Sequence, residues 1–174
     1  MPMAIVLGLL ITPLAVPLDK VPAQSAKRRA PAKPDPRAVR LQRFFTRIHA
    51  PVASLSAAFV RAADRNHLDW RLLPSIAVIE SSGGKHYLNN NIFGWGGGGT
   101  TFSSVRAGIQ QVADRLGHSP IYKNRSVVGK LRLYNSEDAD YVSKVVGVMH
   151  RISATPVLPP VETPPPETEL AYAN

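Results

Sequence analysis

The sequence predicts a mainly α-helical domain over residues 37–153, and three observations support that fold class. Apolar residues in this stretch recur every three or four positions, the spacing that places them on one face of a helix. Strand-like alternation is nearly absent, and only a stub around residues 100–102 has strand character. All but three of the 16 prolines lie outside the stretch, so few of them would interrupt a helix inside it.

Two apolar stripes predict the first two helices. The first stripe comprises Val39, Leu41, Phe44, Phe45 and Ile48. The second stripe comprises Val52, Leu55, Ala58, Phe59 and Ala62. Because each set falls on one helical face, we expect two amphipathic helices that bury these faces.

The third helix is predicted to run from about Trp70 to Ser82. Asp69 is its predicted N-cap, because a carboxylate can accept a hydrogen bond from the unpaired backbone N–H groups of a first helical turn. Gly83 and Gly84 follow the helix and are expected to end it. Residues 87–103 then form a glycine-rich loop.

Three more helices are expected after this loop. Ser104 is the predicted start of the fourth helix, and Ser126 opens a short fifth helix that extends through Leu133. Asn135 or Ser136 is the predicted cap of the last helix. The apolar positions of the fourth and last helices are Ile109, Val112, Ala113 and Leu116, and Tyr141, Val142, Val145, Met149 and Ile152.

The two ends of the chain differ in composition from the helical stretch. An apolar run and a following small-residue cleavage site predict a signal peptide or N-terminal anchor over residues 1–25. The run is short of the roughly 20 residues of a spanning helix, and Pro13 and Pro17 interrupt it, so no stable membrane span is predicted. No Lys or Arg precedes the run, so a misassigned start is the alternative. Residues 26–36 are predicted to be a basic Pro/Ala linker, and residues 154–174 a disordered, Pro-rich acidic tail.

The export signal predicts a protein that is periplasmic, associated with the cell wall or secreted. The formal net charge of +9 favours a polyanionic partner: nucleic acid, an anionic membrane or an anionic cell-wall polymer. Nucleic-acid binding is the main rival interpretation, because arginines such as Arg40, Arg43 and Arg61 could present a positive face. Two features argue against it: the charge is spread over several helices, and the chain carries an export signal.

Several kinds of site have no basis in the sequence. Cysteine is absent, which excludes disulfides, thiol nucleophiles and Cys-based metal sites. The five histidines show no paired ligand spacing, so neither a metal nor a cofactor is expected. Residues 94–99 fit the pattern GxGxxG, but no strand precedes them, so they do not predict a dinucleotide site.

Glu80 is the candidate catalytic residue. It lies at helical spacing from Leu73, Ile76 and Ala77, so its carboxyl group shares the apolar face of the third helix. It also lies in the last turn, where the helix dipole disfavours negative charge. Both effects should raise its pKa, and a carboxylic acid that stays protonated is what cleavage of a glycosidic bond requires. The alternative is a boundary glutamate whose stem is packed and whose head reaches water.

Three short motifs in order resemble those of lysozyme-like peptidoglycan hydrolases. Glu80-Ser81-Ser82-Gly83-Gly84 resembles their Glu-Ser-x-Gly signature, found in soluble lytic transglycosylases and in bacterial glucosaminidases (the mannosyl-glycoprotein endo-β-N-acetylglucosaminidase-like family). Asn91-Ile92-Phe93-Gly94-Trp95 is similar to the Asn-Leu-Phe-Gly motif of the glucosaminidases. Tyr134-Asn135, followed by Asp140-Tyr141-Val142-Ser143-Lys144-Val145, resembles the closing segment of both groups. The resemblance covers about residues 68–152.

The resemblance implies a lysozyme-like helical domain with a glycine-rich loop or small hairpin beside the active-site cleft. It implies that Glu80 is the catalytic acid and that peptidoglycan glycan strands, and other anionic cell-wall polymers, are the partners. The residues implied to bind substrate are Asn91, Phe93, Gly94, Trp95, Tyr134 and Tyr141. Phe93 and Trp95 could offer exposed faces for sugar rings, the alternative for both being core packing.

The chain departs from this family at one point. Many glucosaminidases carry a second acidic residue on a hairpin after the Asn-Leu-Phe-Gly motif, but residues 96–101 contain no carboxylate. The next acid is Asp114; Glu137, Asp138 and Asp140 are interpreted as charges in the first turn of the last helix. The sequence therefore gives no support to a two-carboxylate mechanism, and it leaves open a route with one acid, assisted by the 2-acetamido group of the substrate. The expected function is cleavage of β-1,4 glycosidic bonds in peptidoglycan by an endo-β-N-acetylglucosaminidase-type hydrolase. The alternatives are a lytic transglycosylase with an anhydro product and a non-catalytic cell-wall-binding module.

Overall fold

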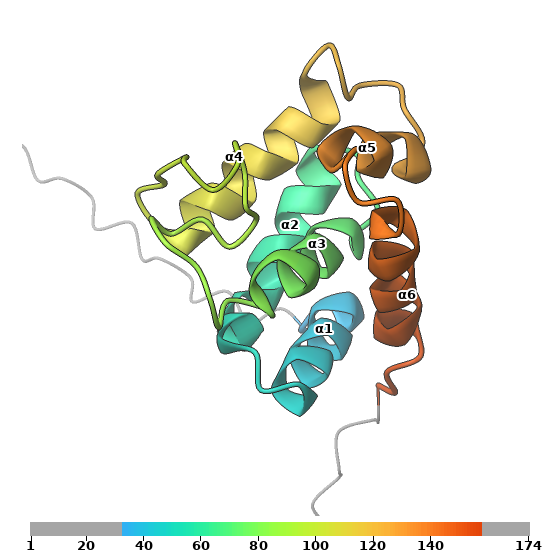
Figure 1. Ribbon diagram of the computed structural model, residues 1–174. Helices are drawn as coiled ribbons and strands as arrows, with labels where there is room; N and C mark the ends of the chain where they lie inside the picture. Colours follow the sequence, from blue (N-terminus) through green and yellow to red (C-terminus); the bar gives the residue numbers. More distant parts are fainter. Residues whose placement is uncertain (1–32, 158–174) are drawn as a thin grey trace, which may run out of the picture. The chain divides into compact units, whose positions relative to one another are not determined.

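Six α-helices and one 3₁₀-helix make up the regular structure of residues 33–157, the part of the chain that this computed structural model describes (Figure 1). The predicted mainly α fold class is confirmed. Residues 100–102 form no strand; the backbone N–H of Phe102 instead donates to the carbonyl of Asn89 across the loop at 2.9 Å. The predicted signal peptide at residues 1–25, most of the linker and most of the tail lie outside the described residues.

The first apolar stripe forms one helix, and the second is divided between two elements. Helix α1 (Pro36–Arg47) begins after Asp35, whose carboxylate accepts a hydrogen bond from the backbone N–H of Arg37. The second stripe forms the 3₁₀-helix η1 (Pro51–Leu55) and then α2 (Ser56–Arg65). The prediction of a single second helix was therefore wrong at its start, where the chain turns through a 3₁₀ segment that Pro51 opens.

Helix α3 (Leu72–Ser81) starts two residues later than predicted. Asp69 is not its N-cap, because its carboxylate accepts from the backbone N–H and the guanidinium of Arg71, just before the helix. The end agrees with the prediction to within one residue. Ser82 takes the left-handed conformation, and Gly83 follows with a positive φ, so close to Ala50 that a Cβ on Gly83 would lie 2.6 Å from the Cβ of Ala50.

Two of the three predicted caps after the loop are confirmed. Ser104 accepts a hydrogen bond from the N–H of Ala107 at the start of α4 (Val105–His118), and Ser126 caps α5 (Val127–Tyr134) in the same way. The predicted cap of the last helix was wrong, because α6 (Tyr141–Ser153) begins six residues after Asn135. The amide oxygen of Asn135 instead accepts from the N–H groups of Glu137 and Asp138 and closes the turn between α5 and α6.

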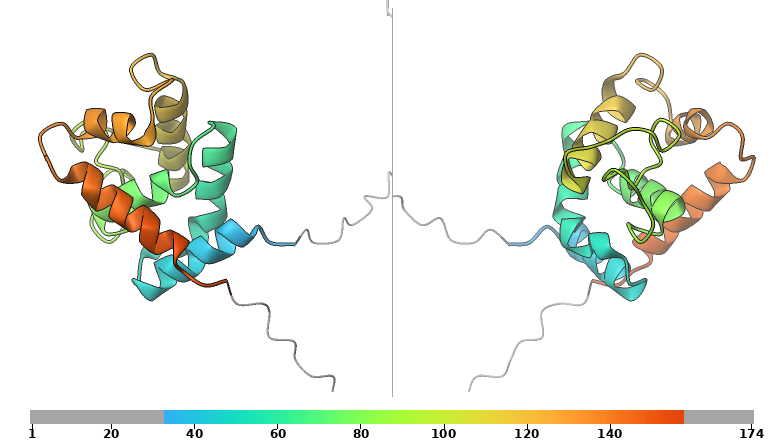
Figure 2. Two further views of the ribbon diagram at one scale, coloured as in Figure 1. Left: turned by 90° about the vertical axis from the view of Figure 1, so that its right-hand side faces the viewer. Right: turned by 60° about the vertical axis from the view of Figure 1, so that its left-hand side comes forward.

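Helix α3 lies in the middle of the domain. It packs against α2 and α6, while α1 and α4 pack on α2 and α5 packs on α6 (Figures 1 and 2). A row of four buried rings runs through the core, with successive centroids 5.7 to 6.3 Å apart: Phe44, Phe45, Phe59 and Phe93. Phe93 belongs to the glycine-rich loop and is fully buried, so the core-packing alternative, and not the exposed stacking face, describes this ring.

Arginines of α1 hold the end of α6. Arg40 donates to the backbone carbonyl of Ser153, and Arg47 donates to the hydroxyl of Thr155. Arg71, just before α3, donates to the hydroxyl of Ser153. These contacts join the first and last helices of residues 33–157. No helix within these residues is both long enough and apolar enough to cross a membrane.

Ser81 joins the end of α3 to the glycine-rich loop. Its side chain is buried, and its Oγ lies 2.9 Å from the carbonyl of Ala77 and 2.8 Å from that of Ile92. The same oxygen accepts a hydrogen bond from the N–H of Gly84. The single proton of this hydroxyl is therefore shared between the carbonyls of Ala77 and Ile92, and its oxygen binds the turn after the helix, so that one side chain connects the helix end, the turn and the loop segment that carries Ile92.

We expect Ser81→Ala to lower the free energy of unfolding by about 1 to 3 kcal/mol, because it leaves buried backbone groups without a partner. Urea denaturation measures the difference. The matched control is Ser103→Ala, since Ser103 is exposed and its side chain makes no hydrogen bond within residues 33–157. Equal stability of the two variants would show that the Ser81 hydroxyl does not hold the loop.

Candidate functional site

Glu80 lies at an open pocket. It projects from the last turn of α3, half-buried, into a hollow of about 470 Å³. The other residues that line this pocket are Gly94, Gly97, Gly98, Tyr134, Asn135, Ser136 and Glu137. They come from the glycine-rich loop, the end of α5 and the turn before α6. The carboxyl group is therefore neither sealed in the core nor fully in solvent.

The surroundings of Glu80 favour its neutral form. Burial raises the pKa of this carboxyl group, and a hydrogen bond from the hydroxyl of Tyr141 to its Oε1, 2.6 Å long, partly opposes that rise. Burial and the nearby carboxylate raise the pKa of Tyr141 as well, so its phenol keeps the proton that it donates. No arginine or lysine of residues 33–157 forms an ion pair with Glu80.

Two stacked tyrosines lie beside the acid: Tyr134 lines the pocket, whereas Tyr141, predicted to bind substrate, is buried and does not line it. The rings of Tyr134 and Tyr141 lie parallel, with centroids 5.8 Å apart and planes 6° apart. Their hydroxyls go to different partners: Tyr141 binds Glu80, whereas Tyr134 donates to the backbone carbonyl of Phe93 at 2.6 Å. The pKa of Tyr134 is raised strongly, above all by burial. The stack thus connects α5 and α6 to the acid and to the loop.

Asn91 shapes the loop from inside. Its side chain is buried; the amide nitrogen donates to the carbonyl of Trp95, and the amide oxygen accepts from the N–H groups of Phe93 and Trp95. Asn91 and Phe93, expected to line a glycan groove, are thus turned toward the protein. What they do is fix a tight turn that presents Gly94 and Trp95 beside Glu80.

Gly94 makes the closest approach to the carboxyl group. Its φ is +61°, and a Cβ on this residue would lie 2.6 Å from Oε2 of Glu80. Only glycine combines this backbone conformation with that distance. The glycine at this position of the motif thus leaves room for the carboxyl group of Glu80 at the wall of the pocket.

A second hollow of about 270 Å³ continues from the first, sharing Gly94, Gly97 and Tyr134 with it. Trp95 lies in it, half-buried, with its ring 5.5 Å from that of Tyr134 and 6.1 Å from that of Tyr122. Exposed Ile121 completes the rim. Together the two hollows give a carboxyl group next to an aromatic and apolar surface.

Sequence reasoning missed Ile121 and Tyr122. They belong to the connection between α4 and α5, which Lys130 fastens by donating to the carbonyls of Leu116 and Tyr122. Burial lowers the pKa of that lysine. The one sequence feature that could have indicated them is a pair of large apolar side chains in an otherwise polar connection. This feature is not specific to a binding site.

Glu137 also lines the pocket, and its interpretation as a helix charge was wrong. Helix α6 has no acidic residue in its first turn. Asp138 forms an ion pair with Lys144 at 2.7 Å, and Asp140 is the residue just before the helix. Glu137 lies in the preceding turn, with its side chain exposed at the opening.

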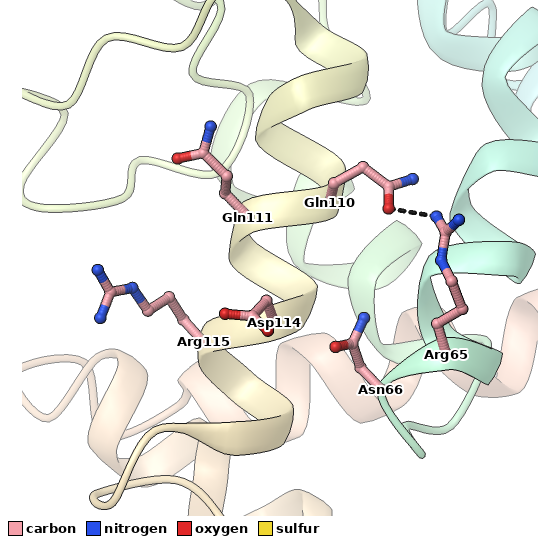
Figure 3. A pocket seen from close by; sticks show the side chains of 6 residues that line it. All are labelled: Arg65, Asn66, Gln110, Gln111, Asp114 and Arg115. Atoms are coloured by element: carbon pink, nitrogen blue, oxygen red, sulfur yellow. Dashed lines mark hydrogen bonds between the residues drawn. The ribbon is translucent and has the colours of Figure 1, made fainter.

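Another hollow, of about 460 Å³, lies between the end of α2 and α4 (Figure 3). Its lining is polar: Arg65, Asn66, Gln110, Gln111, Asp114 and Arg115. The two arginines point to opposite sides of α4, and Arg65 is hydrogen-bonded to Gln110. Asp114 therefore belongs to this hollow and not to that of Glu80. Residues 33–157 contain no group of three or more His, Cys, Asp and Glu side chains able to hold a metal.

We expect Gly94→Ala to lose more stability than Gly97→Ala. The two glycines have nearly the same positive φ, +61° and +64°, so both variants carry the same backbone strain. Only the new methyl group at position 94 collides with Glu80, which should cost about 1 kcal/mol or more in addition. Urea denaturation compares them, and equal losses would contradict the close packing of Gly94 on the carboxyl group.

We expect Tyr141→Phe to raise the pKa of Glu80 further, because it removes the hydrogen bond that stabilises the carboxylate. Carbon-13 NMR titration of the glutamate carboxyl groups measures this. Tyr134→Phe is the matched control: the same ring stack loses a hydroxyl that binds the carbonyl of Phe93 and not Glu80. An unchanged or lowered Glu80 pKa in Tyr141→Phe would show that the hydrogen bond does not control this acid.

Models of known protein families give no match to this chain, and neither do curated protein sequences. The chemistry of the site is therefore the basis for a function. Its features are a half-buried acid, a tyrosine that donates to it, a glycine packed on it, and an open hollow with an aromatic wall.

Proposed function

We propose that this protein cleaves β-1,4 glycosidic bonds of peptidoglycan, as an endo-β-N-acetylglucosaminidase-type hydrolase of the lysozyme-like superfamily, with Glu80 as the general acid. One observation carries the proposal: the carboxyl group of Glu80 is half-buried, has a raised pKa, and faces an open pocket. A carboxyl group with a raised pKa keeps its proton to higher pH than a fully exposed one, and can deliver that proton to a bound substrate.

The acid step follows from these contacts. Oε1 of Glu80 accepts the hydrogen bond from Tyr141, and Oε2 lies beside Gly94 without a hydrogen-bond donor among residues 33–157. Glu80 gives its proton to the glycosidic oxygen as the bond from that oxygen to the anomeric carbon breaks. Tyr141 then stabilises the carboxylate that remains, because it donates to the charged form.

The pocket suits a sugar chain. Its volume of about 470 Å³ lies in the range typical of ligand sites, roughly 300 to 1,000 Å³. Gly97 and Gly98 have no heavy atom within 4 Å of where a Cβ would be, so the loop leaves this side open. The half-buried ring of Trp95 in the adjoining hollow offers an apolar face next to the acid.

The order of the motifs also supports the proposal. Glu80, Gly94 of the loop and Tyr134 of the closing segment line one pocket although they lie far apart in the sequence, and Tyr141, 61 positions after Glu80, donates a hydrogen bond to its carboxyl group. The resemblance to lysozyme-like peptidoglycan hydrolases implies that these motifs lie together at one active site. An exported location, in the periplasm, at the cell wall or outside the cell, is part of the same proposal.

The positive charge of the domain suits an anionic wall polymer. Several arginines that could have formed a nucleic-acid-binding face are hydrogen-bonded within the domain: Arg40 to the carbonyl of Ser153, Arg47 to the hydroxyl of Thr155, and Arg65 to Gln110. The remaining positive charge can attract anionic polymers at long range, an effect that salt weakens.

We expect the full chain to release fragments from purified peptidoglycan and Glu80→Gln to be at least about 100-fold slower, since general acids contribute factors of this order. Mass spectrometry of the released fragments measures the rate. Because the acid must be protonated, wild-type activity should fall as the pH rises through the raised pKa of Glu80.

The matched control is Asp114→Asn, which removes a carboxylate from the polar hollow between α2 and α4. Equal rates for Glu80→Gln and wild type would remove Glu80 from the mechanism. An inactive wild type that still pellets with cell walls would instead indicate a binding module, and an anhydro product would indicate a lytic transglycosylase.

A further inference from the structure

The pocket of Glu80 contains a second carboxylate. Among the described residues, Glu80 and Glu137 are the acidic side chains that line it. They reach it from different elements: Glu80 from the end of α3, and Glu137 from the turn between α5 and α6. The loop position at which the glucosaminidases carry their second acid is occupied here by glycines and threonines.

Glu137 is held in place by its backbone and not by its carboxylate. Its N–H donates to Asn135, and its neighbour Asp138 is fixed by Asn135 and by the ion pair with Lys144 at 2.7 Å. The turn is thus anchored to α6. The carboxylate of Glu137 forms no hydrogen bond or ion pair within residues 33–157.

The other acids near Glu80 in the sequence or in space are used elsewhere. Asp69 pairs with Arg71, Asp138 pairs with Lys144, and Asp114 lines the hollow between α2 and α4. Glu137 combines three properties that none of these acids has together: it lines the pocket of Glu80, it is exposed, and it has no partner in residues 33–157.

We propose that Glu137 is the general base of the reaction, which accepts a proton from the attacking water and makes the reaction a hydrolysis. This inference rests on the proposed function. The difference in environment between the two carboxyl groups, one half-buried and one exposed, is the arrangement that assigns acid and base in paired carboxylates. A general base that activates water also decides between the two products that the sequence left open, because it gives the hydrolysis product and not the anhydro product.

In the proposed hydrolysis, each bond that forms is matched by a bond that breaks. Glu80 gives a proton to the glycosidic oxygen, and the electron pair of the bond to the anomeric carbon leaves with that oxygen. The oxygen of water bonds to the anomeric carbon from the opposite side and gives one proton to Glu137. Glu80 ends as the carboxylate and Glu137 as the acid, and exchange with solvent restores both. The product carries a free reducing end.

The test uses the full chain with Glu137→Gln, Glu137→Ala and Asp140→Asn on purified peptidoglycan. Asp140 is the matched control, since it is an exposed acid of the same turn that does not line the pocket. We expect Glu137→Gln to lower kcat by about 100-fold or more with little change in KM. Asp140→Asn should behave like wild type.

Sodium azide gives a readout that a structural role would not produce. In Glu137→Ala the small anion can take the place of the lost carboxylate and its water, and attack the anomeric carbon directly. We expect azide to restore turnover of this variant and to yield an α-glycosyl azide, detected by mass spectrometry and NMR. Azide should not rescue Glu80→Gln in this way.

Three results would overturn the inference while leaving Glu80 as the acid: a wild-type kcat in Glu137→Gln, a β-glycosyl azide, or an anhydro product from wild type. Thermal unfolding of Glu137→Gln shows whether a loss of activity comes from a folding defect. If this variant unfolds at a lower temperature than wild type, the azide experiment with folded Glu137→Ala decides whether Glu137 is the base. A wild type that cuts no glycan would overturn the proposed function, and this inference with it.

Discussion

The hydrogen bond between Tyr141 and Glu80 is the contact on which the arrangement of this site depends. It joins the last turn of α3 to the first residue of α6, 61 positions later in the sequence. Burying a carboxyl group is unfavourable unless it is hydrogen-bonded, and the tyrosine hydroxyl supplies that bond. The ring of the same tyrosine is fully buried. One side chain thus belongs to both the core and the site.

The long connection between α3 and α4 shows how a loop without regular structure can have a fixed shape. Such a segment must satisfy its backbone polar groups by other means. Ser81 and Asn91, both buried, bond to its carbonyl and N–H groups, and Phe93 fixes it to the core. The glycines at the tip then remain open at the pocket, and the rigid base presents Gly94 at the acid.

Two tyrosines that look alike in the sequence have different roles at this site. Tyr134 and Tyr141 stack on each other, but one hydroxyl holds the loop and the other holds the acid. The first keeps the pocket wall in place, and the second partly opposes the rise in the pKa of Glu80 that burial causes. In the proposed reaction both act through the protein and leave the open side of the pocket to the substrate.

The sequence by itself determined what depends on near neighbours. Helical periodicity placed Glu80 on the buried face of α3, and Ser104 and Ser126 cap their helices as expected, because these interactions span only a few residues. The tertiary structure decided which groups meet across long separations. It turned Phe93 inward, gave Asp69 and Asn135 to turns and not to helix ends, and brought Glu137 to the pocket of Glu80. The reason is that a residue's final partner is set by the packing of distant elements, which no local pattern contains.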